Sequence, residues 1–509
     1  MKKLLALSLA LLLAVPFTGC KSSEERKAEK QQKQVENKVK SLSPDEYLDF
    51  VVLENSEVVP AVNNIVAQLD KTSNTPTAST GKITITPGEG LVDFLNAIDS
   101  KAGAAYTAAF GWFKNLSMTV DAETNGTKLM STFIGLGLND TEIASVDLTI
   151  DTENDSLYMA VPGILNKTLL VKQDGMFAEN PLISALPDSE TTEKLLVKFS
   201  DIVLDGIEVK EKTETEKTIG DLTAKVNAVC FELDEKGVLD IAKNVVSAVI
   251  EDTDIKTYIT EIAKGYYTEA GYTSAEDMIT DAYEGLGNSL ESLNSYQAEE
   301  GTEVVKFTVF TDSLHKLSGI SVDTPDGAGE FIYLKNNGKY AMEAIIRDKK
   351  VFEGKGETKG GKMSGSFTVL DGAELVTLTL SDIDVEAYKK NMLSGKAVLS
   401  FSSKFAESLG IPAAIADAEL VFEFMCETEK TSEFTVSLVY KEKNAAQITI
   451  TGTEKTPDGI TVPADAINIL EDEKALLGVI KNVNYSGLIS KLTEAGASPL
   501  INMLISMIP

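Results

Sequence analysis

Apolar and polar residues alternate with a period of two along much of this chain. Ile83 and Ile85 alternate with Lys82 and Thr84, and the same pattern recurs many times on either side of a central helical block. Such alternation predicts strands with one buried and one solvated face, which is typical of antiparallel sheet. Turn sequences such as Asn125-Gly126 separate the strands. We therefore predict strand-rich regions over residues 81–235 and 301–462.

The clearest meander lies in the second strand-rich region. Three consecutive segments there alternate apolar with polar residues, and their apolar positions are Leu420, Phe422 and Phe424, then Phe434, Val436, Leu438 and Tyr440, then Ala446, Ile448 and Ile450. Three adjacent strands with aligned apolar positions are expected to share one apolar face. This segment is the strongest candidate for a continuous sheet surface.

Other parts of the chain have a helical period. Residues 236–300 predict about three helices between the strand-rich regions, and residues 463–509 predict C-terminal helices. Residues 42–80 predict N-terminal helices and a linker, with Ser43 as helix cap and Pro44 in the first turn. The predicted fold class is α+β: curved antiparallel sheets, as meanders or a half-barrel, with inserted and capping helices. The two strand-rich regions are compatible with a distant duplication or with one large curved sheet.

The N-terminus predicts export. Lys2 and Lys3 precede an apolar run of about a dozen residues, too short to span a bilayer as a helix, and the run ends in Phe17-Thr18-Gly19-Cys20. This segment resembles the type II signal peptide and lipobox of bacterial lipoprotein precursors, although Phe17 stands where that family prefers Leu. The resemblance implies cleavage of residues 1–19 and attachment of diacylglycerol to Cys20. Residues 20–41 would then tether the body to the cell membrane on its extracytoplasmic side.

Charge and cysteine content narrow the function classes. The net charge is −31, which repels nucleic acid and anionic lipid headgroups, so we exclude a nucleic-acid partner. With Cys20 lipidated, Cys230 and Cys426 remain. Both lie in strand-like contexts and are expected to be buried single thiols, although an exported protein can also join such a pair in a disulfide.

No pattern of catalytic residues emerges. The single histidine, His315, follows Asp312-Ser313-Leu314 and is expected to be a solvated turn residue. Zinc sites need clustered Cys and His ligands. Asp151, Glu153 and Asp155 have the spacing of a calcium loop but lack its glycine and final glutamate, so we expect a hairpin turn there. We predict no enzyme, no metal and no cofactor.

The architecture itself suggests a binding protein. Exported, lipidated and strand-rich with inserted helices, the chain resembles Lol-type lipoprotein carriers and mycobacterial-type lipid-binding lipoproteins, which hold acyl chains in a half-barrel capped by helices. It is also similar to large uncharacterised lipoproteins of acidic composition. The resemblance to the lipid carriers implies a lipid-like ligand in an apolar cavity, for which we select Phe422, Phe424, Val436 and Leu438.

Two other functions remain open. If the same four residues are packed solid, a surface scaffold or protein-interaction role is favoured; a cleft with convergent acids would favour an enzyme. The apolar C-terminal segment, residues 499–509, is expected to fill an apolar groove of the body. Interfacial membrane contact, or a cover over a ligand cavity, are the alternatives for that segment.

Overall fold

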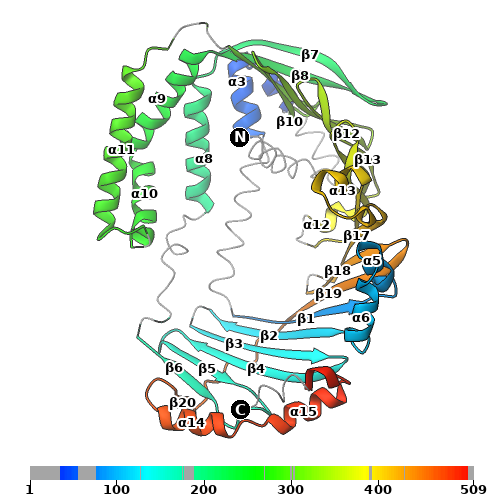
Figure 1. Cartoon of the computed structure of the whole chain (residues 1–509). Coiled ribbons are helices and arrows are strands. Elements are labelled where there is room, and N and C mark those ends of the chain that lie inside the picture. The colour runs from blue at the N-terminus through cyan, green and yellow to red at the C-terminus, as the bar shows by residue number, and fades with distance from the viewer. Residues whose placement is uncertain are drawn as a thin grey trace. The chain divides into compact units, whose positions relative to one another are not determined.

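A computed structural model describes residues 35–55, 76–126, 128–174, 176, 189–268, 270–298, 301, 304–388, 392–428 and 430–501 (Figure 1). These residues form two compact units. Unit 1 comprises the described residues within Met1–Asp70, Glu179–Gly361 and Val369–Gly372; unit 2 comprises those within Lys71–Ala178, Lys362–Thr368 and Ala373–Pro509. Both units combine antiparallel sheet with helices, so the predicted α+β class is confirmed.

Unit 1 contains one antiparallel sheet in the strand order β7–β8–β9–β10–β11–β12–β13. Its helices are α3 (Pro44–Asp49), the π-helix η1 (Phe50–Glu54), α8 (Ser189–Leu204), α9 (Glu235–Glu251), α10 (Thr253–Tyr266) and α11 (Ala275–Ser295). Its strands are β7 (Val209–Ile219), β8 (Leu222–Leu233), β9 (Val305–Thr311), β10 (Leu317–Thr324), β11 (Gly327–Asn336), β12 (Lys339–Ile346) and β13 (Lys349–Lys359).

The strands of unit 2 are paired in the order β15–β16–β17–β18–β19–β1–β2–β3–β4–β5–β6, all antiparallel, with β20 added parallel to β6. Its first strands are β1 (Thr77–Pro87), β2 (Leu116–Asn125), β3 (Leu129–Leu138), β4 (Thr141–Asp151), β5 (Ser156–Ala160) and β6 (Leu169–Lys172). The later ones are β14 (Lys362–Leu370), which has most of its length in this unit, β15 (Glu374–Asp384), β16 (Gly395–Phe401), β17 (Ala418–Thr428), β18 (Thr431–Tyr440), β19 (Lys443–Lys455) and β20 (Ile467–Asn468).

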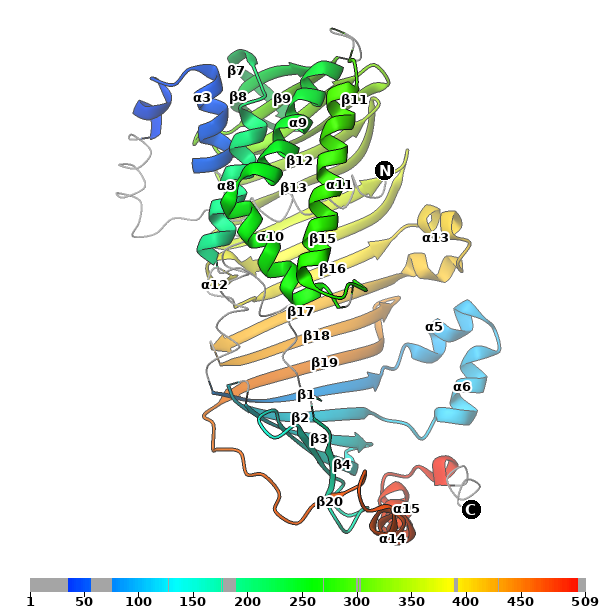
Figure 2. The same cartoon turned by 90° about the vertical axis from the view of Figure 1, so that its left-hand side faces the viewer.

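The helices of unit 2 are short. They are α5 (Leu91–Ile98), α6 (Ala102–Phe110), α12 (Val385–Tyr388), α13 (Ser403–Leu409), the 3-10 helix η2 (Ala413–Asp417), α14 (Glu473–Lys481) and α15 (Tyr485–Glu494). Figure 2 shows α5 and α6 beyond the ends of the sheet strands rather than across their middles. Most of the sheet surface in unit 2 is therefore free of these helices.

The N-terminal helix α3 covers one face of the unit 1 sheet. Ser43 accepts a hydrogen bond from the Glu46 N–H, and the Glu46 carboxylate accepts one from the Ser43 N–H, which completes the capping box behind Pro44. Asp45 Oδ1 accepts a hydrogen bond of 2.7 Å from the Val209 N–H, joining the helix to β7. The buried core beneath consists of Val39, Tyr47, Leu48, Phe50, Val51, Val209, Val229, Phe231 and Val309.

The other face of this sheet is buried by the sheet itself. A second core gathers residues from β7, β8, β9, β11 and β12, namely Ile219, Val226, Ala228, Phe310, Ile332, Leu334 and Ala341. An ion pair of 2.7 Å between Lys217 and Glu330 crosses from β7 to β11. Strands that are far apart in the order can meet in this way only if the sheet curls, so the predicted curvature is present within unit 1.

Three helices were predicted between the strand-rich regions, and α9, α10 and α11 are found there. They pack chiefly against one another and lie side by side with α8 (Figure 1). Helix α8 precedes β7 in unit 1, and α5 follows β1 in unit 2. Within the predicted N-terminal helices and linker of residues 42–80, residues 56–75 lie outside the described residues.

Each of the two compact units combines segments that are far apart in the sequence. Residues 81–235 contribute strands β1–β6 to unit 2 but helix α8 and strands β7 and β8 to unit 1. In unit 2, β1 from the first strand-rich region pairs along ten residues with β19 from the second. Sequence order predicted domains as continuous segments, whereas long-range strand pairing joins distant segments into one sheet.

Tyr47 provides a test of how strongly α3 holds unit 1 together. Its side chain is 0% exposed, so Tyr47→Ala should lower the free energy of unfolding by about 3–5 kcal/mol through lost burial and a cavity. Tyr47→Phe keeps the ring and should cost about 1 kcal/mol, because Thr311 and His315 both keep Asn227 as a neighbour. Urea denaturation followed by circular dichroism measures both changes. Equal losses in the two variants would show that burial of the ring is not the main contribution.

Candidate functional site

The four residues expected to bound a ligand cavity lie together on one face of β17 and β18. Phe422 is paired opposite Val436, and Leu438 is paired opposite Leu420. The Phe424 ring lies against Phe434 with 4.9 Å between ring centroids. All four side chains are half-buried, so they are neither packed solid nor fully exposed.

Strand register extends this face across much of unit 2. One row of paired residues runs Phe424, Phe434, Ile450, Ile83, Met118 and Leu136, and the next row runs Phe422, Val436, Ile448, Ile85 and Leu116. Paired residues of an antiparallel ladder point to the same side of the sheet. We call these eleven residues the apolar face.

The apolar face is unusually open. Exposed fractions of 38–44% are found at Ile85, Leu116, Leu136, Ile448 and Ile450. On the opposite face, the alternating positions of β1 and β19 are polar and include Lys82, Thr84, Thr449 and Thr451. A two-faced sheet normally buries its apolar side, so a half-exposed apolar face of this extent indicates a surface that binds something.

Helices of unit 2 pack at the ends of the strands. Phe94 of α5 joins Ala418, Tyr440 and Ala445 in one small core. Leu492 of α15 joins Leu138, Ala495 and Ala497 in another. Both clusters lie beside the first or last residues of their strands, so they stabilise the strand ends. In the described part of unit 2, they leave the middle of the apolar face uncovered.

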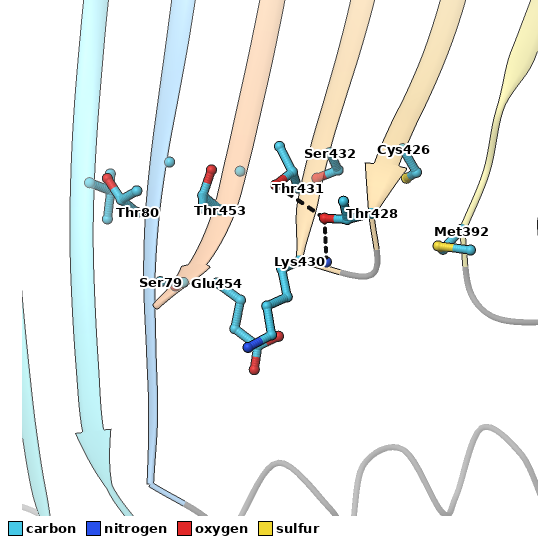
Figure 3. Close-up of a pocket in the computed structure, with 13 residues that line it drawn as sticks. Ser79, Thr80, Met392, Cys426, Thr428, Lys430, Thr431, Ser432, Thr453 and Glu454 are labelled. Atoms are coloured by element: carbon cyan, nitrogen blue, oxygen red, sulfur yellow. Dashed lines mark hydrogen bonds between the residues drawn. The ribbon is translucent and has the colours of Figure 1, made fainter. Parts of the chain in front are cut away.

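A pocket of about 440 Å³ adjoins the apolar face (Figure 3). Its floor follows from the next row of the register, which runs Cys426, Ser432, Gly452, Gly81 and Val120. Two paired glycines leave a depression between larger side chains. Neither glycine has a positive φ, so their small size, and not their backbone conformation, matters here. Sequence reasoning missed the pocket, although an isolated glycine within a strand is a signal for close approach.

The rim of the pocket is polar. Lys430 and Glu454 extend in the same direction from the ends of β18 and β19 (Figure 3), and the Glu454 N–H donates to the Lys430 carbonyl at 2.8 Å. Thr428 Oγ1 accepts from the Lys430 N–H at 3.2 Å and fixes the turn. The pocket thus places one ammonium and one carboxylate in a lining that also includes several Ser and Thr residues. Phe422, Phe424, Val436 and Leu438 are not among its lining residues.

His315 differs from its expectation as a solvated turn residue. It does lie in a turn, with a φ of 59°, but its ring is partly buried in unit 1. The Tyr47 Oη lies 2.9 Å from His315 Nδ1 and 2.7 Å from Thr311 Oγ1. Asn55 donates to the His315 carbonyl at 2.7 Å. Docking of α3 and η1 buries this turn, which a local pattern could not predict.

Burial shifts the titration of this cluster. It lowers the pKa of His315, and the nearby Lys212 ammonium lowers it further, while the Asp312 carboxylate acts in the opposite direction. Burial raises the pKa of Asp312. It also raises the pKa of Tyr47 to about 12. Because Tyr47 is 0% exposed and bonds to both Thr311 and His315, the cluster fastens the N-terminal helices to unit 1.

The cysteines and acidic loop are in simple settings. Cys230 and Cys426 are both free, so the pair forms no disulfide. Both are half-buried, whereas full burial was expected. Asp151 ends β4 and accepts hydrogen bonds from the Asn154 main chain and side chain, at 3.1 and 2.7 Å, within a hairpin turn. The described residues contain no grouping of three or more acidic, Cys or His residues suited to a metal ion.

Two further expectations concern membranes. Cys20 and residues 502–509 lie outside the described residues, so lipidation and the end of the C-terminal segment stay predictions. Leu500 and Ile501, at the start of that segment, pack against the small core around Leu138. Within the described ranges, no helix has the length and apolar character needed to cross a bilayer.

Comparisons with known proteins give no identity. No known family and no curated protein matches the chain. Among solved structures, isotype 1 transferrin binding protein B from serogroup B Neisseria meningitidis matches at 10% identity and a TM-score of 0.13, over 75% of this chain and 77% of that chain. The intact Ap-TbpB, with N and C lobes, matches at 8% identity and a TM-score of 0.09, over 75% and 78%. A mutant TbpB from Haemophilus parasuis Hp5 gives 8% and 0.09, over 75% and 76%. Scores this low carry no argument about fold or function.

The His315 cluster predicts how stability depends on pH. The folded-state pKa of His315 lies below its usual value of 6.5, so the unfolded chain binds this proton first as the pH falls. The contribution is therefore complete above pH 6.5 and declines below it until the folded-state pKa is passed. Urea midpoints for unit 1 measured on either side of pH 6.5 should show this loss.

His315→Asn is the matched control, because Asn tolerates a positive φ and retains an acceptor for Tyr47 but does not titrate. The variant should lose the part of the pH dependence just below pH 6.5. The opposite dependence expected from Asp312, whose pKa is raised from 3.8, should remain at lower pH. An unchanged profile in the variant would contradict the role given to His315.

Proposed function

We propose that this protein is a non-catalytic binding lipoprotein of the cell envelope. Acyl groups on Cys20 anchor it to the membrane with its body on the extracytoplasmic side, and the apolar face of unit 2 holds an amphipathic, lipid-like ligand. The anchoring rests on the sequence of the first twenty residues. The ligand class rests on the chemistry of the apolar face.

The single observation that carries the proposal is the extent of the half-exposed apolar face. Its two rows of side chains cross strands β17, β18, β19, β1 and β2, and one row continues onto β3; five members are 38–44% exposed. Apolar surface left in water forgoes about 25 cal/mol for each Å². A ligand that covers this surface recovers that free energy, and an acyl chain is a ligand with matching chemistry.

A lipid-like ligand also fits the polarity around the face. Along the strands, the apolar face is bordered by the pocket, whose rim carries Lys430 and Glu454. An amphiphile has the same sequence of chemistry, a long apolar part followed by a polar group. A purely apolar partner would leave the polar rim uncovered, and a purely polar ligand would leave the apolar rows exposed.

A second function is a surface lipoprotein that binds another protein. The observation that favours it is openness: the four selected residues are half-buried, only Leu438 packs against the α5 core, and none of them lines the pocket. A partner strand or helix could cover such a surface. The same experiment separates the two functions.

Native mass spectrometry tests the ligand directly. The chain from position 20 to its end, with Cys20→Ser so that no acyl group is attached, is produced in a bacterial host and purified without detergent. A stoichiometric adduct that organic extraction identifies as lipid would support the proposal. A clean apo mass that does not change on addition of lysophospholipid would overturn it and favour the protein-interaction function.

Substitutions on the two faces of β19 supply a matched pair. Ile448→Ser with Ile450→Ser removes two branched side chains from the apolar face, and each contributes about 1.5–3 kcal/mol when fully buried. We expect at least tenfold weaker binding of a lysophospholipid in fluorescence titration. Thr449→Ser with Thr451→Ser changes the opposite face of the same strand and should leave affinity within twofold. Equal effects of the two pairs would place the ligand elsewhere.

A further inference from the structure

The pocket beside the apolar face has a chemistry that the proposed function leaves unused. Along β1, the pocket floor at Gly81 is followed on the same face by Ile83 and Ile85. Along β19, Gly452 is followed in the same direction by Ile450 and Ile448. The polar pocket therefore lies at one end of an apolar track on two strands, formed by Ile83 and Ile85 of β1 and by Ile448 and Ile450 of β19. The track from Gly81 to Pro87 spans about 20 Å at ~3.3 Å per residue.

Small residues make the pocket end of this track concave. Ser432, Gly452 and Gly81 occupy adjacent positions of one row, while the neighbouring row carries Phe434, Ile450 and Ile83. A Cβ added at Gly452 would lie 3.2 Å from Ser432 Oγ, and one added at Gly81 would lie 3.3 Å from the Thr451 carbonyl oxygen. A larger side chain at either glycine would therefore fill the pocket from its floor without requiring a forbidden backbone conformation.

The rim presents both signs of charge within one small site. Lys430 supplies an ammonium and Glu454 a carboxylate, from adjacent strand ends joined by a main-chain hydrogen bond. Ser79 and Ser432, each with a side-chain hydroxyl, also line the pocket. A group with one negative and one positive charge matches this pair, since each of its charges finds an opposite charge on the protein.

Net charge favours the same class of headgroup. The chain carries a net charge of −31, which disfavours the approach of an anionic amphiphile. A zwitterion experiences no net repulsion and can still form two charge-assisted hydrogen bonds at the rim. A neutral headgroup would leave both rim charges without a charged partner.

We propose that this pocket is the headgroup subsite for a zwitterionic amphiphile bearing a phosphate and a primary ammonium. The phosphate pairs with Lys430 and the ammonium with Glu454, while the acyl chain lies along Ile83, Ile85, Ile448 and Ile450. This inference rests on the proposed function, because it names the ligand class of the same surface.

The test compares three lauroyl amphiphiles that differ only in their heads: lauroyl-lysophosphatidylethanolamine, which is zwitterionic, lauroyl-lysophosphatidylglycerol, which is anionic, and monolauroylglycerol, which is neutral. Each is titrated below its micellar concentration into the chain from position 20 onward carrying Cys20→Ser. We expect the zwitterion to bind at least tenfold more tightly than either of the others, a difference that one good charge-assisted contact supplies.

The alkylation rate of Cys426 reports whether the pocket is occupied. It lines the pocket and is free and half-buried, so a bound headgroup should slow its alkylation by a maleimide. Cys230 is free, half-buried and in unit 1, which makes it an internal control. Peptide mass spectrometry should show slower labelling at Cys426 and unchanged labelling at Cys230 when the zwitterion is added. Equal protection of both, or of neither, would overturn the subsite.

Variants separate the headgroup subsite from the apolar face. Lys430→Met should reduce the preference for the zwitterion over the neutral amphiphile about tenfold, and Gly452→Val should abolish protection of Cys426. Lys455→Met is the matched control, because it removes the same charge from the end of the same sheet at a lysine that pairs with Asp121 outside the pocket. It should leave the preference unchanged.

The outcomes distinguish the two levels of the proposal. If none of the three amphiphiles binds, the proposed function fails, and the subsite fails with it. If all three bind equally and Lys430→Met behaves like Lys455→Met, the headgroup inference fails while lipid binding on the apolar face stands. Circular dichroism of each variant confirms that it is folded before its binding is compared.

Discussion

The pairing of β1 with β19 is the contact on which the surface of unit 2 depends. It joins residues more than 350 positions apart in the sequence and aligns Ile83 with Ile450 and Ile85 with Ile448. A shift of one residue would bring Lys82 and Thr84 to the apolar side and break both apolar rows. The register, and not the apolar content alone, therefore makes one continuous face from two separate strand-rich regions.

The two units manage their apolar surfaces differently. Unit 1 covers one face of its sheet with α3 and η1 and buries the other by curling β7 and β8 over β11 and β12. Unit 2 places its helices at strand ends and leaves the rows through Ile448 and Ile450 half-exposed. Exposed apolar area weakens folding and promotes association, so a sheet that retains it is best explained by a binding role. The acidic surface, with a net charge of −31, opposes association between copies of the chain.

The capping box at Ser43 and the buried Tyr47 give the N-terminal helix a mechanical role in the proposed lipoprotein. The chain between the predicted anchor at Cys20 and the body leads into α3, held by Asp45 and Tyr47, and then into η1, whose C-cap Asn55 bonds to the Leu314 carbonyl. A membrane tether transmits force at its point of attachment, and these contacts place that point on a buried core of unit 1. The His315 turn adds a pH-sensitive element to the same attachment.

Local sequence determined the strands, the helices and which residues of each strand share a face. The alternation around Phe422, Phe424, Val436 and Leu438 predicted their common side, and Ser43-Pro44 predicted the start of a helix, because both signals depend on a few neighbouring residues. Tertiary structure alone decided that β1 lies beside β19, that Gly81 meets Gly452 to form a pocket, and that Tyr47 covers His315. Those contacts join residues hundreds of positions apart. A period of two specifies the face of a strand but carries no information about which strand lies next to it.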